Sequence, residues 1–173
     1  MNKRFHIGID IGAKGAICIM DRDKPVSIIP MPTIGDQLDY SGLYQILSSY
    51  EGGRGMIVFE KLGVIFKTTK TTAFSMGRQL GAVEMLCTAL SIPFTKVPAK
   101  EWQKEMFSGV DNIQKVSTLT KSGITRDTKG MALVAIKRLY PNLKLTFGTR
   151  ASKPHDGLID AVLMADFSRR KYD

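Results

Sequence analysis

Hydrophobic and polar residues alternate strictly at the start of the chain. Residues 5–12 have the sequence FHIGIDIG, and this period of two predicts a β-strand with one apolar face. The other face carries the carboxylate of Asp10 between two glycines. Two further short apolar stretches follow after polar turns, at residues 16–20 and 26–29. Three consecutive strands joined by short turns favour an antiparallel meander.

The next predicted strand is of a different kind. Residues 56–60 form a continuous apolar run that ends in Glu60, as expected for a strand that is buried on both faces. Residues 94–97 predict one more strand, after which Pro98 is well placed to begin a helix. Apolar residues at helical spacing predict four other helices, at residues 38–50, 71–90, 127–139 and 154–167. This order of elements describes an α/β domain built on one mixed sheet.

Length and composition restrict the class of protein. The chain has 173 residues, 43% hydrophobic and 24% charged, which suits a single domain over residues 1–173 and excludes a large multidomain enzyme. Cys18 and Cys87 show neither CxxC nor Cys/His spacing, which argues against a disulfide framework and a zinc site. The sequence has no signal-peptide pattern, and no run approaches ~18 apolar residues. We therefore expect a soluble cytoplasmic protein without a membrane partner.

Positive charge is in excess along the chain. There are 25 Lys and Arg against 16 Asp and Glu, a formal net charge of +9, so we expect binding to polyanions and first of all to nucleic acid. Four Lys or Arg and no acid lie between Glu60 and Glu84, and six lie between Asp127 and Asp156. Such cations neutralise phosphates and make DNA binding depend on salt.

Four acids occupy positions where acids are hard to explain structurally. Asp10 lies inside the first predicted strand, and Glu60 ends the fourth, at positions that usually favour apolar side chains. Asp156 and Asp160 are four residues apart, on the same face of the last predicted helix. Like charges at that spacing repel each other, and a divalent cation would reverse the sign of the interaction. A ligand set made only of oxygen atoms indicates Mg²⁺ or Mn²⁺ rather than zinc.

Each acid also has a purely structural interpretation. Asp156 could cap the helix or interact with its dipole. Glu60 could end a strand and pair with Lys61, and Asp10 could be an ordinary turn acid. Asp160 is harder to explain in this way, because apolar residues surround it in the sequence. The metal hypothesis rests on the three acidic segments together.

The acidic segments carry a family resemblance. IGIDIG at residues 7–12, VFE at residues 58–60 and HDGLIDA at residues 155–161 resemble the RuvC-like Holliday junction resolvases of the RNase H-like nuclease superfamily, and their phage-type branch in particular. VPAKEW at residues 97–102 is similar to the family's short strand that runs into a helix with a tryptophan. The resemblance implies an RNase H-like fold, with a five-stranded mixed sheet formed by the meander and two parallel strands.

The resemblance also implies a function. It is that of a homodimeric endonuclease that cuts four-way or branched DNA by paired symmetric nicks, using two Mg²⁺ ions per site, with Mn²⁺ as a substitute. The implied metal-binding and catalytic carboxylates are Asp10, Glu60, Asp156 and Asp160. Bacterial members commonly space the last two acids by three residues, whereas here the spacing is four. A late histidine of some relatives has no clear equivalent, and Lys153 is our candidate for its catalytic role. The implied setting is the cytoplasm of a bacterial or phage-infected cell.

A DNA-binding surface is predicted around these acids. FKTTKTT at residues 66–72 combines an aromatic ring, two lysines and four hydroxyls, so we expect this loop to follow the DNA backbone and to stack Phe66 on bases opened at the junction. The alternative is that Phe66 belongs to the core. For Trp102 we expect a place in the core or in an interface. The predicted DNA-binding residues are Lys14, Lys61, Phe66, Lys67, Lys70, Arg78, Arg150 and Lys153.

The helix predicted at residues 71–90 has an apolar surface wider than one contact with a sheet needs. Gly77 and Gly81 lie four residues apart on it. This surface could form a two-fold dimer interface, in which two active sites face a symmetric junction. The structural alternative is burial of the same surface inside one subunit.

Three other functions remain open from the sequence. A strand containing DxG also begins actin-like sugar kinases, but this chain has neither GxGxxG nor GxxxxGK[ST], so we expect no nucleotide cofactor. A basic domain of this class could bind branched nucleic acid without cutting it, although all four carboxylates are present. A nuclease acting on RNA/DNA hybrids or on flap DNA would share the metal chemistry.

Overall fold

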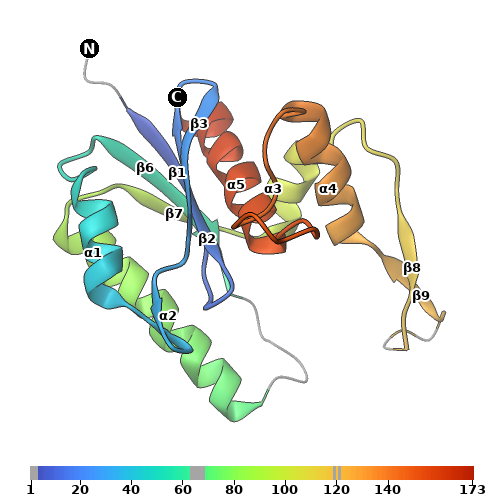
Figure 1. The fold of residues 1–173 in the computed structure, drawn as a ribbon, viewed down its shortest axis with the longest axis horizontal. Coiled ribbons are helices and arrows are strands. Elements are labelled where there is room, and N and C mark those ends of the chain that lie inside the picture. The colour runs from blue at the N-terminus through green and yellow to red at the C-terminus, as the bar shows by residue number, and fades with distance from the viewer. Residues whose placement is uncertain (1–3, 63–68, 119, 121) are drawn as a thin grey trace.

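The computed structural model describes residues 4–62, 69–118, 120 and 122–173. Its centre is a five-stranded sheet in the order β3-β2-β1-β6-β7 (Figure 1). The strands are β1 (Phe5–Asp10), β2 (Ala16–Asp21), β3 (Lys24–Pro30), β6 (Gly55–Glu60) and β7 (Phe94–Val97). The first three form an antiparallel meander, β6 lies parallel to β1, and β7 lies parallel to β6. The predicted five-stranded mixed sheet is therefore confirmed.

Helices cover both faces of this sheet (Figure 1). α1 (Tyr40–Ser48) and α2 (Lys70–Ala89) lie on one face, whereas α3 (Ala99–Met106), α4 (Thr128–Leu139) and α5 (Asp156–Tyr172) lie on the other. Side chains of a strand point alternately to the two faces. Accordingly, Ile17 and Ile19 of β2 join the apolar core beside α1 and α2, and Cys18 and Met20 join the core beside α3, α4 and α5.

Backbone contact between α5 and β1 sets the position of the last helix. A Cβ atom added at Gly8 would lie 2.0 Å from the carbonyl oxygen of Ala161 and 2.5 Å from the amide nitrogen of Ala165. Only glycine allows this close approach, which explains a glycine in the middle of a buried strand. The N-terminal end of α5 is thereby held at the carboxyl end of β1.

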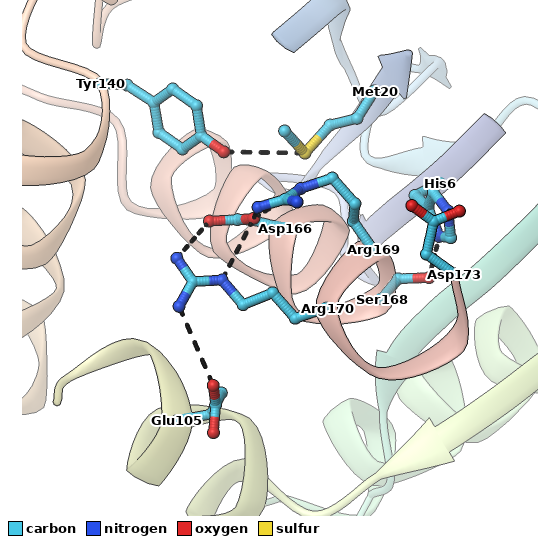
Figure 2. Close-up of polar contacts among 9 residues, drawn as sticks. All are labelled: His6, Met20, Glu105, Tyr140, Asp166, Ser168, Arg169, Arg170 and Asp173. Carbon is cyan, nitrogen blue, oxygen red and sulfur yellow. Dashed lines mark hydrogen bonds and ion pairs between the residues drawn. The ribbon is translucent and has the colours of Figure 1, made fainter. Parts of the chain in front are cut away.

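A buried carboxylate fixes the other end of α5 (Figure 2). Asp166 is 1% exposed, and its two oxygens accept hydrogen bonds from Arg169 Nη2 at 2.7 Å and from Arg170 Nη2 at 3.0 Å. Arg170 also pairs with Glu105 of α3. Because a buried charge is costly unless it is paired, this network ties the end of α5 to α3.

The observed elements differ from the predicted ones in three respects. α5 continues past residue 167 to Tyr172. A small hairpin of β4 (Thr33–Ile34) and β5 (Gln37–Leu38) and a two-stranded arm of β8 (Gln114–Val116) and β9 (Ile124–Arg126) were not predicted. These strands are too short for a period-two pattern to emerge. In the part of the chain that the structure describes, no helix is long and apolar enough to span a membrane.

Candidate active site

Two of the predicted acids meet at one edge of the sheet. Asp10 is the last residue of β1 and Glu60 the last residue of β6. The two strands are parallel neighbours, with Ile9 paired to Phe59. Because the carboxyl ends of adjacent parallel strands lie at the same edge, both carboxylates emerge side by side. Each is half-buried.

The start of α5 brings the other two acids to the same edge. A Cβ atom added at Gly157 would lie 2.7 Å from Asp10 Oδ2 and 2.6 Å from the carbonyl oxygen of Lys14. The first turn of α5 therefore rests against the end of β1. Asp156 is the first residue of this helix, and Asp160 follows one turn later. The three acidic segments of the sequence are thus brought together.

Burial and repulsion by neighbouring acids make two of these carboxylates, Asp10 and Asp160, unusually hard to ionise. Burial, followed by the charges of Glu60 and Asp156, raises the pKa of Asp10 to about 7. Burial, followed by the charges of Asp10, Glu60 and Asp156, raises the pKa of Asp160 to about 7 as well. Desolvation and nearby negative charge both raise the pKa of a carboxylate. The four acids therefore share one electrostatic site.

Trp102 positions one of these acids. Its indole Nε1 donates a hydrogen bond of 2.9 Å to Glu60 Oε1, while the ring itself is buried in the core. Of the two places expected for Trp102, core or interface, the structure shows the core. The hydrogen bond adds a second role, because it fixes the rotamer of a half-buried carboxylate at the end of β6.

Lys129 is the residue that the sequence interpretation missed. It lies in the first turn of α4, and its Nζ forms an ion pair with Asp156 Oδ2. Its positive charge also lowers the pKa values of Asp10 and Asp160, against the larger effects that raise them. In the sequence Lys129 was one of six cations in a basic stretch. Its place beside the acids depends on the packing of α4 against α5.

The other predicted residues lie on several different segments. Lys14 and Lys61 are exposed and follow closely after the ends of β1 and β6, and Lys70 is exposed at the start of α2. Arg78 is exposed on α2 and donates to Gln37 Oε1 at 3.3 Å. Arg150 and Lys153 are exposed in the segment before α5. Phe66 and Lys67 lie outside the described residues.

His155 has a structural contact at the start of α5. Its Nδ1 accepts a hydrogen bond of 3.2 Å from the backbone nitrogen of Leu158, so it is the N-cap of α5. The catalytic role proposed for Lys153 stays a prediction.

The donor chemistry of the site fits a hard divalent cation. All four acids supply oxygen ligands, and the increased pKa values show that positive charge would be favourable there. Among the residues that the structure describes, however, no group of three or more His, Cys, Asp or Glu side chains is arranged so that it could hold a metal ion. The four acids thus interact electrostatically, but their side chains are not arranged as a metal-binding site.

Comparison with known proteins identifies the fold. No protein-family model and no curated protein matches the sequence. Among solved structures, the chain is similar to Thermus thermophilus RuvC, with 13% identity and a TM-score of 0.57, and to T. thermophilus RuvC in complex with a Holliday junction substrate, with 16% identity and a TM-score of 0.54. Both similarities cover 95% of this chain and 94% of the other. The chain therefore has the RuvC-like variant of the RNase H-like fold.

Proposed function

We propose that this protein is a metal-dependent endonuclease that cuts four-way DNA junctions by paired symmetric nicks. One observation carries the proposal: Asp10, Glu60 and Asp160, from distant parts of the sequence, lie at one edge of the sheet, where the charge of Glu60 contributes to the raised pKa values of Asp10 and Asp160. Buried carboxylates whose pKa values are raised by neighbouring negative charge, as those of Asp10 and Asp160 are, destabilise the protein unless a cation neutralises them. A phosphodiester nuclease needs such a cation site next to a basic surface.

The carboxylates of Asp10, Glu60, Asp156 and Asp160 would hold two Mg²⁺ or Mn²⁺ ions. When bound, such a pair supplies the charge that activates water and stabilises the leaving oxygen of a phosphodiester. Cleavage of the bond between phosphorus and the 3′ oxygen leaves 5′-phosphate and 3′-hydroxyl ends. Trp102 holds Glu60 in place, and Lys129 neutralises Asp156. The ion pair uses Asp156 Oδ2.

Branched DNA is the substrate that we propose. Exposed Lys14 and Lys61 flank the ends of β1 and β6, where a scissile phosphate would have to lie. Arg150 and Lys153 precede α5 in the sequence. The whole chain carries a net charge of +9. A solved structure with the same fold is a complex with a Holliday junction substrate. The assignment to the phage-type branch and to the cytoplasm of a bacterial or phage-infected cell rests on the sequence alone.

A homodimer through α2 completes the proposal. The apolar surface of this helix is divided: Val83 and Cys87 are buried against the sheet, whereas Phe74 is 72% and Met85 65% exposed. Gly77 and Gly81 lie between the two exposed side chains on the same helix face. A Cβ atom at either glycine would meet nothing within 4 Å. Glycines flanked by large apolar side chains allow two helices to approach closely, so we expect a second copy here.

The deciding experiment compares cleavage of labelled four-way, three-way, duplex and RNA/DNA hybrid substrates, with Mg²⁺ or with chelator. We expect paired nicks in the four-way junction only when Mg²⁺ is present. Asp10→Asn and Asp160→Asn should abolish cleavage and leave junction binding largely intact, since binding depends on the basic surface. Selective cleavage of the hybrid would instead identify a ribonuclease. Binding without cleavage of any substrate would identify a non-catalytic module.

Dimerisation is tested separately by sedimentation. We expect a dimer for the wild type and dissociation for Gly81→Leu, because a leucine on the exposed face would hold two α2 helices apart. Gln45→Leu, at an exposed position on α1, is a control for the added apolar surface. A wild-type protein that sediments only as a monomer, with and without DNA, would remove the dimer from the proposal.

A further inference from the structure

A two-stranded arm extends from the domain next to the candidate active site. β8 and β9 form this arm between α3 and α4, and it projects outward beyond the helices (Figure 1). At its base, the backbone nitrogen of Asp127 donates a hydrogen bond of 2.7 Å to the carbonyl oxygen of Ile113. Asp127 is also the N-cap residue of α4, and Lys129 follows in the first turn of that helix. Because Lys129 pairs with Asp156, the base of the arm is fixed close to the acids.

Two aliphatic side chains are exposed on the arm. Val116 and Ile124 are directly opposite each other in the pairing of β8 with β9, so their side chains lie on the same face of the ribbon. Val116 is 88% exposed and Ile124 47%. Val116 is the most exposed large apolar side chain in the described part of the chain. Among the described residues, neither side chain belongs to one of the two apolar cores.

The rest of the arm has the composition of a nucleic-acid-binding segment. Residues 112–126 include three cations, Lys115, Lys121 and Arg126, and no Asp or Glu. They also include several Ser and Thr, whose hydroxyls commonly contact phosphates. A two-stranded ribbon has dimensions that a DNA groove admits. The partner that fits this arm is therefore DNA, because its phosphate backbones are negatively charged and the faces of its stacked bases are apolar.

We propose that the arm is a wedge, whose Val116 and Ile124 insert between base pairs at the branch point of DNA bound at the acid site. Lys115, whose Nζ pairs with Asp127 Oδ1 at 3.2 Å at the base of the arm, would exchange that carboxylate for a phosphate of the bound DNA. This inference rests on the proposed function, because it takes branched DNA as the substrate. Apolar side chains are used in this way by proteins that unstack and kink DNA. Unstacking costs least where the stack is already interrupted, so the wedge favours branch points over continuous duplex.

The test measures base unstacking directly, without cleavage. Four-way, three-way and duplex DNA carry 2-aminopurine at the branch or at a distant position, and the protein is added in chelator. The variant is Val116→Thr combined with Ile124→Thr, since threonine keeps the β-branched shape and strand propensity while it removes apolar surface. The control is Val26→Thr on β3, where Val26 is 56% exposed at the edge strand of the sheet.

For the wild type and Val26→Thr, we expect increased fluorescence from the probe at the branch and none from duplex. The double variant should lose most of this increase, and its preference for branched over duplex DNA should fall about tenfold. Single variants at the two positions should each lose part of the fluorescence increase and part of the preference for branched DNA. Equal fluorescence and equal branch preference in the double variant overturn the wedge.

The remaining outcomes separate the wedge from the proposed function. Branch-dependent fluorescence in a wild type that cuts nothing with Mg²⁺ removes the nuclease and supports the wedge. If the wild type binds branched DNA no better than duplex, the wedge and the proposed junction-cutting function are both wrong. A double variant that sediments differently from wild type but unstacks bases equally shows that the pair contacts a second copy of this chain, which also overturns the wedge.

Discussion

Asp10→Asn should stabilise the protein in the absence of metal. Asparagine has the size and shape of aspartate but no charge, and the charge of Asp10 is opposed by burial and by Glu60 and Asp156. The pKa of Asp10 is raised from 3.8 to about 7. The shift of roughly three units corresponds to about 4 kcal/mol at 1.36 kcal/mol per unit. Because Asp160 shares this repulsion, we expect about 2–4 kcal/mol for the single substitution.

The pH dependence of this effect has a definite sign. Between pH values of about 4 and about 7 the folded state holds the Asp10 proton more tightly than the unfolded state does. The wild type therefore loses stability as the pH rises through that interval, and the contribution of Asp10 to this loss is absent from the variant. The two proteins should have equal stability near pH 4, at roughly the unfolded pKa of aspartate, and differ most at about pH 8.

Thermal unfolding in chelator measures the difference. For a domain of this length, about 2–4 kcal/mol corresponds to an increase in Tm of roughly 4–16 °C at about pH 8. Added Mg²⁺ should raise the Tm of the wild type and have a smaller effect on the variant. Asp111→Asn, at an exposed acid in the segment between α3 and β8, is the control and should change little. An Asp10→Asn protein that melts at or below the wild-type temperature in chelator at about pH 8 would refute the shared electrostatic site.

Three other substitutions test the contacts around the site and along α5. Lys129→Ala removes a charge that lowers the pKa of Asp10, so the pH at half-maximal cleavage should rise; an unchanged pH profile would contradict this role. Trp102→Phe removes the hydrogen-bond donor to Glu60. A hydrogen bond to a charged group is worth ~1.5–3 kcal/mol, so kcat should fall by about ten- to hundredfold when cleavage is measured well below Tm. Asp166→Asn disrupts the pairing with Arg169 and Arg170 and should lower the urea midpoint by an amount equivalent to about 3 kcal/mol; an unchanged midpoint would show that the network is not stabilising.

The sequence predicted the elements that carry the site because local patterns specify them. The alternation around Asp10, the apolar run before Glu60 and the helical spacing after Asp156 correspond to β1, β6 and α5. Two short parallel strands and a meander are enough to place the first two acids at one edge. The β8–β9 arm was missed because three-residue strands lack a periodic signal.

What the sequence by itself determined is therefore the order of strands and helices, the excess of positive charge and the identity of the four acids. Only the tertiary structure decided that Lys129 faces Asp156, that Trp102 donates to Glu60, and that Val116 remains exposed. The reason is physical: periodicity and composition depend on neighbours along the chain, whereas an ion pair, an increased pKa or an uncovered side chain depends on how α3, α4 and α5 pack on the sheet. Close approach at Gly8 and Gly157, where a Cβ atom does not fit, sets that packing for α5 at a scale that residue patterns do not specify.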